Sequence, residues 1–459
     1  MMFSLNKKNK ISFFDHLYYT KINKYQVIYN PYSYKGPAVI PLNSFALLKK
    51  VLNGKNTVKD ILDDQITLDL LNNLCQYDLL SVDGEKNHMF ANPLSNPEKA
   101  SFWIDVTNQC NFRCTYCYID RKKEVIDPDR FMSLFDKLMT LKNDYPFKEI
   151  VLVLAGGEPL LYFEVFKKLI KTIQTLQQKY SERVKFQTIV ITNGSLLTEE
   201  KAVFLRKNGI RVAISLDGIG EYNNKTRKFI DGSGTFKYVL KGLEIAKKNN
   251  ILSNVITTVS SKNINHLPQL VSFLLSKEVG FQLQFYKKTT QFCLDEAVVF
   301  DKKAIDSYLK TIKVVYDYYD SKPKSKKRLS IFLESSKALF FTSEYSCAAG
   351  YNYFTITQNC ELKVCPASNI KIPFDKVANF ISVLREKNKK FIQYSVNSNP
   401  ICKKCLWKYA CKGGCKMEKF VAGTTKSTPN ICSFYKKMLP YLIKLEAQSI
   451  IRQNRIASS

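Results

Sequence analysis

The chain has 459 residues and a formal net charge of +30, from 70 Lys and Arg against 40 Asp and Glu. No apolar run reaches the roughly 18 residues of a membrane-spanning helix, and the first residues lack the apolar core of a signal peptide. We therefore expect a soluble, cytoplasmic protein of two or three domains with no membrane partner. In that compartment, 13 cysteines favour metal ligation over disulfides.

The positive charge has two interpretations. A strongly basic surface can bind nucleic acid or an acidic peptide. However, lysines are spread along the whole chain, and no Arg-rich stretch with interleaved aromatic residues stands out. We therefore favour a lysine-rich composition over a nucleic-acid interface as the origin of the charge.

The first part of the chain, residues 22–85, predicts a small α+β unit. Its expected strands and helices are Tyr25–Tyr29, Ala38–Ile40, Ser44–Leu52, Val58–Leu62, Leu68–Cys75 and Leu79–Val82. This order is typical of a winged-helix module, which we place at residues 1–95. Cys75 lies on an apolar helix face and is expected to pack there.

From residue 101 the sequence alternates strictly between apolar strands and amphipathic helices. The expected strands are Phe102–Val106, Ile150–Leu154, Phe186–Ile191, Val212–Leu216, Asn254–Val259 and Phe281–Phe285. The expected helices are Arg130–Leu141, Phe163–Tyr180, Glu199–Lys207, Phe236–Lys248 and Leu267–Ser276. This pattern predicts the α/β class, with a partial (β/α)6 TIM-like barrel over residues 100–290. Functional loops are then expected at the carboxyl ends of its strands.

Three further segments complete the expected domain organisation. A helical connector at residues 291–345 contains a helix at Ala304–Tyr319, and a cysteine-rich domain with little regular patterning covers residues 346–435. A C-terminal helix is expected over residues 436–459. Cys293 lies outside every motif and is expected to be a packing residue.

Cys110, Cys114 and Cys117 form a C-x3-C-x2-C motif directly after the first barrel strand. Three thiolates at this spacing can hold three corners of a [4Fe–4S] cluster and leave the fourth iron open to a substrate. The aromatic Tyr116 can shield the cluster or a bound ligand from solvent. The alternative is a structural zinc site with a distant fourth ligand.

The second barrel strand ends in Gly156, Gly157 and Glu158, followed by Pro159. We expect the two glycines to let the backbone approach a bound ligand closely, because no Cβ intrudes. The carboxylate of Glu158 can hold an ammonium group. Taken alone, the segment is also compatible with a simple turn before the next helix.

Together these motifs resemble those of the radical S-adenosylmethionine (SAM) enzymes. The resemblance continues in the order expected for that family, with the segment TNGS at 192–195 and the segment SLDG at 215–218. It implies that Cys110, Cys114 and Cys117 are the catalytic cluster ligands and that the methionine amino and carboxylate groups chelate the open iron. Such a cluster passes one electron to the sulfonium and yields a 5′-deoxyadenosyl radical that abstracts an unactivated hydrogen. An electron donor such as flavodoxin or ferredoxin is then required.

The resemblance also implies which residues contact SAM. The GGE segment, Gly156 to Glu158, contacts the methionine ammonium, while Asn193, Ser215 and Arg227 are candidates for the ribose and carboxylate. The family often carries an Asp shortly before that Arg. The stretch 222–227 of this chain is YNNKTR, so we expect the acidic role to be absent.

The C-terminal cysteines resemble the SPASM extension of radical SAM enzymes. Their central spacing is C-x2-C-x5-C-x3-C. The resemblance implies two auxiliary [4Fe–4S] clusters: one is held by Cys402, Cys405, Cys411 and Cys432, and the other by Cys347, Cys365 and Cys415. A four-thiolate zinc site is the alternative.

Cys360 stands where the SPASM pattern has a Gly, five positions before Cys365. It is either a fourth ligand to the incomplete auxiliary cluster or a bystander thiol. A Gly position usually needs special backbone geometry, which weakens the ligand role. Without this ligand, the cluster is open to a substrate thiolate.

The N-terminal module resembles the PqqD-like leader-recognition elements of ribosomal peptide maturases, which bind a leader as an added strand at a sheet edge. A plain stabilising domain is the alternative. We therefore predict a radical SAM/SPASM enzyme that abstracts hydrogen from a ribosomally made precursor peptide or protein and forms a crosslink such as a thioether. One alternative is an anaerobic sulfatase-maturating enzyme, which makes formylglycine but carries an Asp where this chain has Pro366. A zinc-stabilised, basic nucleic-acid-binding protein is the other.

Overall fold

The structure is a computed structural model. It describes residue 5 and residues 8–52, 57–59, 68–84, 98–140, 147–288, 298–322, 329, 331–333, 339–374, 380–421, 423–429 and 431–457. Most of the expected helix Val58–Leu62 lies outside these residues, as does Cys293. Within the described part of the chain, no helix is long and apolar enough to span a membrane.

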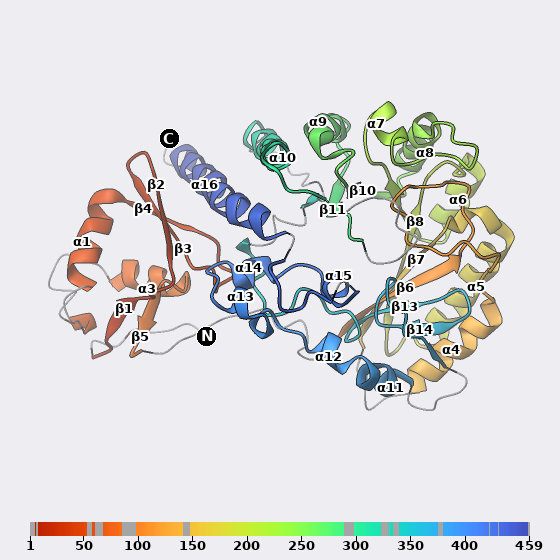
Figure 1. Cartoon of the computed structure of the whole chain (residues 1–459), viewed down its shortest axis with the longest axis horizontal. Coiled ribbons are helices and arrows are strands. Elements are labelled where there is room, and N and C mark those ends of the chain that lie inside the picture. The colour runs from red at the N-terminus through yellow and green to blue at the C-terminus, as the bar shows by residue number, and fades with distance from the viewer. Residues whose placement is uncertain are drawn as a thin grey trace.

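The fold is organised by a ten-stranded sheet in the order β12-β11-β10-β9-β8-β7-β6-β13-β14-β15 (Figure 1). Six neighbouring strands are mutually parallel and match the six that the sequence predicts. These strands are β6 (Lys99–Thr107), β7 (Glu149–Gly156), β8 (Lys185–Thr192), β9 (Arg211–Ser215), β10 (Leu252–Val259) and β11 (Phe281–Phe285). The predicted α/β class is confirmed.

Five helices between these strands match the prediction. They are α4 (Pro128–Thr140), α5 (Phe163–Lys179), α6 (Glu199–Lys207), α8 (Phe236–Lys248) and α9 (Leu267–Ser276). The short helix α7 (Glu221–Asn224) and the 3-10 turns at Pro159–Tyr162 and Ile264–His266 were not predicted. The start of α6 shows why the boundaries were predictable. Thr198 accepts a hydrogen bond from the Lys201 N–H, and Glu199 and Glu200 occupy the first turn, where the helix dipole favours acidic residues.

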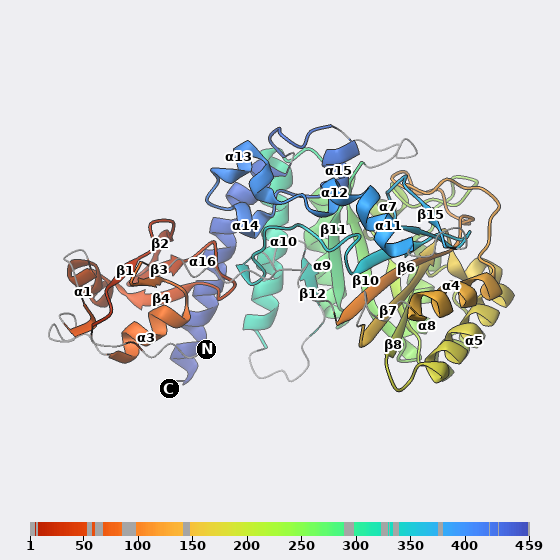
Figure 2. The same ribbon diagram turned by 90° about the horizontal axis from the view of Figure 1, so that it is seen from below.

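Strand β6 shows how the two faces of the sheet differ. Phe102 and Ile104 are fully buried on one face, and the Phe102 ring lies 5.4 Å from that of Phe135 in α4. Because successive side chains point to opposite faces, Trp103 and Asp105 lie on the other, inner face. The helices therefore cover the outer face (Figure 2), and polar groups on the strands can reach the interior.

Short strands extend the sheet beyond the six that were expected. β12 (Ile331–Leu333) is parallel to β11, and β13 (Tyr353–Ile356) is parallel to β6. β14 (Glu361–Lys363) and β15 (Ile372–Pro373) then continue antiparallel. Strands of two to four residues carry too little periodicity to be predicted. Through β13, the cysteine-rich segment joins the barrel sheet. The domain boundaries drawn from the sequence stay a prediction.

The N-terminal module has two small antiparallel sheets. β1 (Ile11–Phe13) pairs with β5 (Leu80–Val82), and β2 (Tyr18–Ile22), β3 (Tyr25–Tyr29) and β4 (Ala38–Pro41) form the second sheet. The helices are α1 (Leu42–Leu52) and α3 (Leu68–Gln76). On β3, Ile28 belongs to the module's own core, whereas Val27 and Tyr29 belong to the main core of the protein. The module is therefore packed against the body of the chain.

The remaining elements connect this module to the barrel. They are α10 (Lys302–Asp320), α11 (Phe380–Lys387), α12 (Lys389–Ile392), a 3-10 turn at Val396–Ser398, α13 (Pro400–Lys403), α14 (Lys408–Cys411), α15 (Lys416–Val421) and α16 (Cys432–Ala457). Helix α16 runs beside the N-terminal module and contacts β2, β3 and β4 as well as α10 (Figures 1 and 2). The C-terminal helix is thus packed against the N-terminal module.

Candidate active site and cysteine clusters

The cysteine loop starts where β6 ends, at the carboxyl edge of the sheet. The Arg113 N–H donates to the Lys228 carbonyl at 2.7 Å, and the Thr115 N–H donates to the Thr226 carbonyl at 3.0 Å. The ring of Phe112 meets that of Phe229 edge to face, with centroids 5.0 Å apart. The segment 226–229, which follows β9, therefore holds the cysteine loop in place.

The two glycines at the end of β7 approach this same loop. The Gly157 N–H donates to the Thr107 carbonyl at 2.7 Å, and the Glu158 N–H donates to the Gln109 carbonyl at 2.8 Å. A Cβ at Gly157 would lie 2.1 Å from the Gln109 oxygen, and one at Gly156, whose φ is +107°, would lie 2.6 Å from the Thr107 oxygen. The sequence predicted room for a ligand here. The structure shows that the glycines make room for the backbone of the cysteine loop.

The carboxylate of Glu158 is fully buried and bonded to the neighbouring strand. Oε1 accepts from the Thr192 hydroxyl at 2.6 Å and from the Leu160 N–H at 3.1 Å, and Oε2 accepts from the Asn193 N–H at 2.8 Å. Burial raises the pKa of Glu158, and these hydrogen bonds oppose that rise. The side chain therefore joins the ends of β7 and β8. A contact from the GGE segment to an ammonium stays a prediction.

Asn193 lies between the end of β8 and the cysteine loop. Its Nδ2 donates to Asn111 Oδ1 at 2.8 Å and lies 3.9 Å from Cys110 Sγ. Its Oδ1 accepts from the Ser195 hydroxyl at 2.7 Å, which in turn accepts from Asn111 Nδ2 at 2.9 Å. Ser215, half-buried, ends β9 at the same edge of the sheet. The structure places both predicted residues at this edge, and their contacts with SAM stay predictions.

Arg227 is buried beside the second cysteine of the motif. Its Nε lies 2.9 Å from Asp217 Oδ2, and its Nη1 lies 3.9 Å from Cys114 Sγ. The Tyr116 hydroxyl donates to the same Asp217 oxygen at 2.5 Å. The expectation that no acidic residue serves Arg227 is wrong, because Asp217 supplies the carboxylate from a position ten residues earlier. Its place in the SLDG segment, at the end of β9, was the signal that could have identified it.

Asp217 is also a junction between neighbouring segments. Only 1% exposed, it accepts hydrogen bonds from the Thr226 hydroxyl and from the Thr258 N–H, each at 3.0 Å. It therefore holds together the cysteine loop, the segment after β9 and the strand β10.

Replacing Asp217 by Asn is expected to destabilise the protein strongly. The change leaves the Arg227 charge buried without its partner, and removing one member of a buried ion pair typically costs about 3–5 kcal/mol. Urea unfolding measures the loss. Glu199→Gln is the matched control, because its ion pair with Lys248 is exposed, so that loss of this pair and of the helix-dipole interaction should cost much less than loss of the buried pair. Equal stability of the two variants would contradict the role assigned to Asp217.

Burial disfavours the thiolate form of two of the three motif cysteines in the absence of a metal. Burial raises the pKa of Cys110 to about 12, and burial also raises that of Cys114 to about 12, where Arg227 opposes the rise. Such thiols stay protonated at neutral pH unless a metal holds them, because metal binding deprotonates a coordinating thiol. The donor set of Cys110, Cys114 and Cys117 therefore fits an iron–sulfur cluster.

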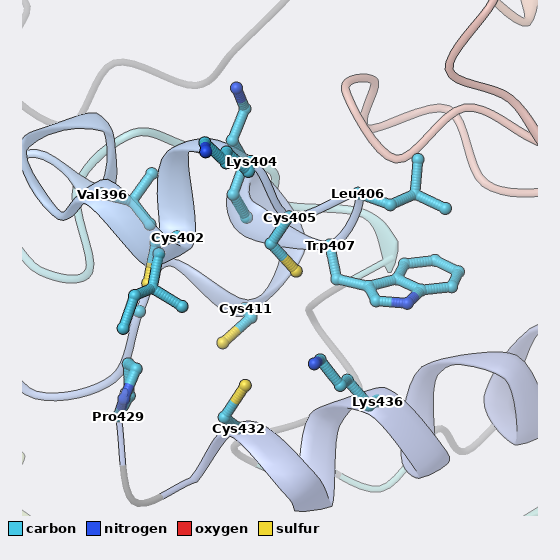
Figure 3. A pocket seen from close by; sticks show the side chains of 13 residues that line it. Val396, Cys402, Lys404, Cys405, Leu406, Trp407, Cys411, Pro429, Cys432 and Lys436 are labelled. Atoms are coloured by element: carbon cyan, nitrogen blue, oxygen red, sulfur yellow. The ribbon is translucent and has the colours of Figure 1, made fainter. Parts of the chain in front are cut away.

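Four C-terminal cysteines line one pocket with a volume of about 480 Å³ (Figure 3). We call them the first cysteine cage; they are Cys402, Cys405, Cys411 and Cys432. Figure 3 shows the sulfur atoms of Cys405, Cys411 and Cys432 directed toward one another, with Cys432 placed by the first turn of α16. Trp407 lines the same pocket. The structure thus gathers the four cysteines that the SPASM resemblance groups together.

Three other cysteines, Cys347, Cys365 and Cys415, form what we call the second cysteine cage. Burial raises the pKa of Cys365 to about 12, and the nearby charges of Cys415 and Cys347 raise it further. The pKa of Cys415 is likewise raised, first by burial and also by Cys347. Across the described residues, no three His, Cys, Asp or Glu side chains are close enough together to hold a single metal ion. Auxiliary cluster binding by either cage stays a prediction.

Cys360 lies in the turn between β13 and β14. Its N–H donates to the Thr357 carbonyl at 2.8 Å, and its φ of +54° is in the left-handed region that favours glycine. This agrees with the Gly found at this place in the SPASM pattern. The side chain is fully buried within the main hydrophobic core. Its surroundings favour a packing role over cluster ligation.

Asp105 is a buried carboxyl that the sequence analysis missed. It lies on the inner face of β6, where it accepts from Trp103 Nε1 at 3.0 Å. Burial raises its pKa to about 6, although Lys363 opposes the rise. Tyr118 follows the cysteine loop. Burial raises the pKa of Tyr118, and the charges of Asp105 and Cys365 raise it further. A carboxyl that titrates near neutral pH therefore lies between the cysteine loop and the second cysteine cage. In the sequence, the only signal for Asp105 was the presence of an acidic residue inside an otherwise apolar strand.

Comparison with known proteins agrees with this geometry. Residues 104–274 match the radical SAM superfamily. A cysteine-type anaerobic sulfatase-maturating enzyme from Clostridium perfringens is 26% identical over 357 residues, which cover 72% of this chain and 93% of that protein. Among solved structures, anSMEcpe with bound AdoMet and Kp18Cys peptide has a TM-score of 0.63 and 23% identity, covering 76% of this chain and 99% of the other. SuiB of Streptococcus suis, bound to the precursor peptide SuiA, has a TM-score of 0.55 and 15% identity, covering 91% and 98%.

A partial parallel barrel with three cysteines on the loop after its first strand defines the radical SAM class. This chain carries such a domain at residues 104–274. It is homologous to the anaerobic sulfatase-maturating enzymes.

Proposed function

We propose that the chain is a radical SAM enzyme that modifies a ribosomally made peptide or protein and uses two auxiliary iron–sulfur clusters. The observation that carries this proposal is the gathering of ten cysteines into three separate groups: the cysteine loop and the two cages. Each group contains the cysteines that the resemblance to radical SAM/SPASM enzymes assigns to one cluster. A fold stabilised by scattered zinc ions, or a basic nucleic-acid-binding protein, gives no reason for this grouping.

The residues around the cysteine loop have distinct parts in this proposal. A cluster bound by Cys110, Cys114 and Cys117 would supply the electron that cleaves SAM. Arg227 places a fixed positive charge beside Cys114, and Asp217 keeps that charge oriented. Asn193 presents its amide beside Cys110, where a polar part of the nucleotide would lie. The partly buried ring of Tyr116 would limit access of water to the cluster.

Two observations support a peptide or protein substrate. The names of similar proteins refer to sulfatase maturation and to peptides, namely Kp18Cys for anSMEcpe and SuiA for SuiB. The likeness to SuiB also extends over 91% of this chain, more than the 76% shared with anSMEcpe. The additional coverage suits an N-terminal module that takes part in peptide recognition. A thioether crosslink is the product that we propose first.

Sulfatase maturation is the second candidate, because the Clostridium perfringens relative carries that name. The family base directly after the second SPASM cysteine is replaced here by Pro366. Reaction of the reconstituted protein with the Cp18Cys peptide separates the two functions. Formylglycine in that peptide, detected by mass spectrometry, would establish the second candidate. The loss of two hydrogen atoms from a candidate precursor peptide, with no formylglycine in Cp18Cys, would establish the first. Short reading frames beside the gene supply the candidates.

The N-terminal module offers a test of leader recognition. Its three-stranded sheet has β2 and β4 as edges, either of which can receive an added strand. Proline placed in turn at those positions of β2 and β4 whose N–H points away from β3 removes outward backbone donors one at a time, and edge strands tolerate this change. We expect positions on one edge to lower the affinity for the precursor peptide at least tenfold, while SAM cleavage without peptide is unchanged.

Anisotropy of a labelled precursor peptide measures this affinity. Unchanged affinity for every folded variant of both edges would exclude strand addition. Point variants are preferable to deletion of residues 1–95. Val27 and Tyr29 belong to the main core, so the deletion would expose that core as well as remove the module.

A further inference from the structure

Helix α15 carries two buried lysines, Lys416 and Lys419, one turn apart. Their side chains are among the few charged groups in the interior, with exposures of 1% and 5%. The ammonium of Lys416 donates to the Ile392 carbonyl at 2.9 Å. By contrast, the ammonium of Lys419 has no hydrogen-bond partner among the described residues. Lys419 is therefore the group whose burial needs an explanation.

The position of Lys419 is defined by the link between the two cages. That link runs from Cys411 of the first cage to Cys415 of the second, and its three inner residues all have positive φ, from +57° to +82°. A Cβ on Gly413 would lie 2.8 Å from Lys419 Nζ and 3.8 Å from Cys402 Sγ. The glycine thus leaves space for the ammonium directly beside a cysteine of the first cage.

An ammonium without water or a counter-ion is costly to bury. Burial lowers the pKa of Lys419, and the charges of Cys402, Cys411, Cys415 and Glu418 oppose this shift. Three of these four neighbours belong to the cages. The ring of Tyr394 lies 5.3 Å from Nζ and adds a weaker cation–π attraction. The site therefore favours an anionic group, and the cages are where such a group would bind.

We propose that Lys419 is the counter-charge of the auxiliary clusters and raises the reduction potential of at least one of them. This inference rests on the proposed function, in which the cages bind iron–sulfur clusters. A cluster held by thiolates is anionic and becomes more negative when it accepts an electron. A fixed positive charge in a water-excluded site stabilises the reduced form more than the oxidised form, since potentials follow net charge and burial.

The reduction potential of an auxiliary cluster bears on the oxidation of the substrate radical. After hydrogen abstraction, the substrate carbon radical must lose one electron and one proton before a closed-shell product forms. An oxidised auxiliary cluster, if held by the cages, would supply the one-electron acceptor for this step. A more positive potential makes that transfer more favourable. Lys419 is accordingly a positioning residue, because it acts on the cluster and not on the substrate.

The test uses the full chain with Cys110, Cys114 and Cys117 replaced by Ala, so that only auxiliary clusters remain. Iron content is measured first, and electron paramagnetic resonance then follows reduction at set potentials. Lys419→Met removes the charge with little change in volume, and Lys419→Arg retains it. Lys404→Met is the matched control, because Lys404 lines the pocket of the first cage but is exposed. Water and salt should screen its charge.

We expect Lys419→Met to lower the ratio of reduced to oxidised cluster at least tenfold at a fixed potential, which is about 59 mV for a one-electron couple. In Lys419→Arg and Lys404→Met, the ratio of reduced to oxidised cluster should stay near that of the parent protein. If Lys419→Met keeps the iron content of the parent protein and its midpoint reduction potential does not shift, the inference is overturned. If Lys419→Met loses iron, Lys419→Gln is titrated instead. Loss of iron from both neutral variants but not from Lys419→Arg supports the counter-charge, and loss from all three overturns it. A parent protein without auxiliary iron refutes the proposed function instead.

Discussion

Replacement of Cys110, Cys114 and Cys117 by Ala is expected to abolish the formation of 5′-deoxyadenosine. Reductive cleavage of SAM needs an iron that is open to the nucleotide, and these thiols are the only protein groups that we assign to that iron's cluster. The two cages lie on other segments of the chain. The variant should therefore keep its auxiliary iron, about eight atoms per chain if both cages bind cubane clusters.

Chromatography of the products of anaerobic reaction with SAM and dithionite measures the loss. Cys75→Ala is the matched control, because Cys75 lies on α3 of the N-terminal module, outside the cysteine loop and both cages. It should leave iron content and SAM cleavage unchanged. Persistent 5′-deoxyadenosine in the triple variant would exclude the radical SAM chemistry, and loss of all iron would show that the three groups do not bind independently.

The sequence predicted the barrel well because its strands are long and apolar and its helices are amphipathic. Each of the six expected strands overlaps one observed strand, and α6, α8 and α9 have the predicted bounds. The short strands β12 and β13 were missed, since three or four residues cannot show a period. Their positions at the two ends of the parallel sheet depend on pairing with β11 and β6, which are distant in the chain.

The sequence predicted which cysteines lie near one another better than it predicted their supporting contacts. The spacing of the cysteine loop is a local property, whereas the grouping within the cages was implied by the SPASM resemblance. Cluster ligation stays a prediction. The partner of Arg227 is not local in the same way. Asp217 reaches it because the segment 217–227 folds back on itself at the end of β9, which a search of the residues immediately before Arg227 does not reveal. Likewise, Gly157 is required by the approach of Gln109, a contact between the segment after β7 and the cysteine loop.

The arrangement of the cages has a consequence for the order of events in the proposed reaction. Asp105 and Tyr118 lie close to both the cysteine loop and the second cage. The charges of Asp105 and of Cys365 in the second cage both raise the pKa of Tyr118, which follows the loop. The first cage lies farther along the chain, beside Trp407. The ring centroid of Trp407 is 5.0 Å from that of Tyr18 in the N-terminal module. An electron taken from substrate near the barrel would thus reach the second cage before the first. Lys419 lies between the two.

Replacement of both Cys402 and Cys405 by Ala is therefore expected to uncouple SAM cleavage from product formation. Removing two thiolates opens the first cage, so about four irons per chain should be lost. The cysteine loop is unaffected, and 5′-deoxyadenosine should still form. Peptide product should fall at least a hundredfold, because the electron accepted by the second cage then has no further acceptor.

Iron analysis, together with mass spectrometry of the peptide, checks this result. Cys360→Ala is the control, since the buried position of Cys360 in the main core favours packing, and its iron content should equal that of the parent. Full iron in the double variant would remove Cys402 and Cys405 from the ligand set. Loss of about four irons with undiminished product would instead show that the first cage binds a cluster in the parent protein but that this cluster lies outside the electron path. The second cage alone would then have to return the electron to an external acceptor.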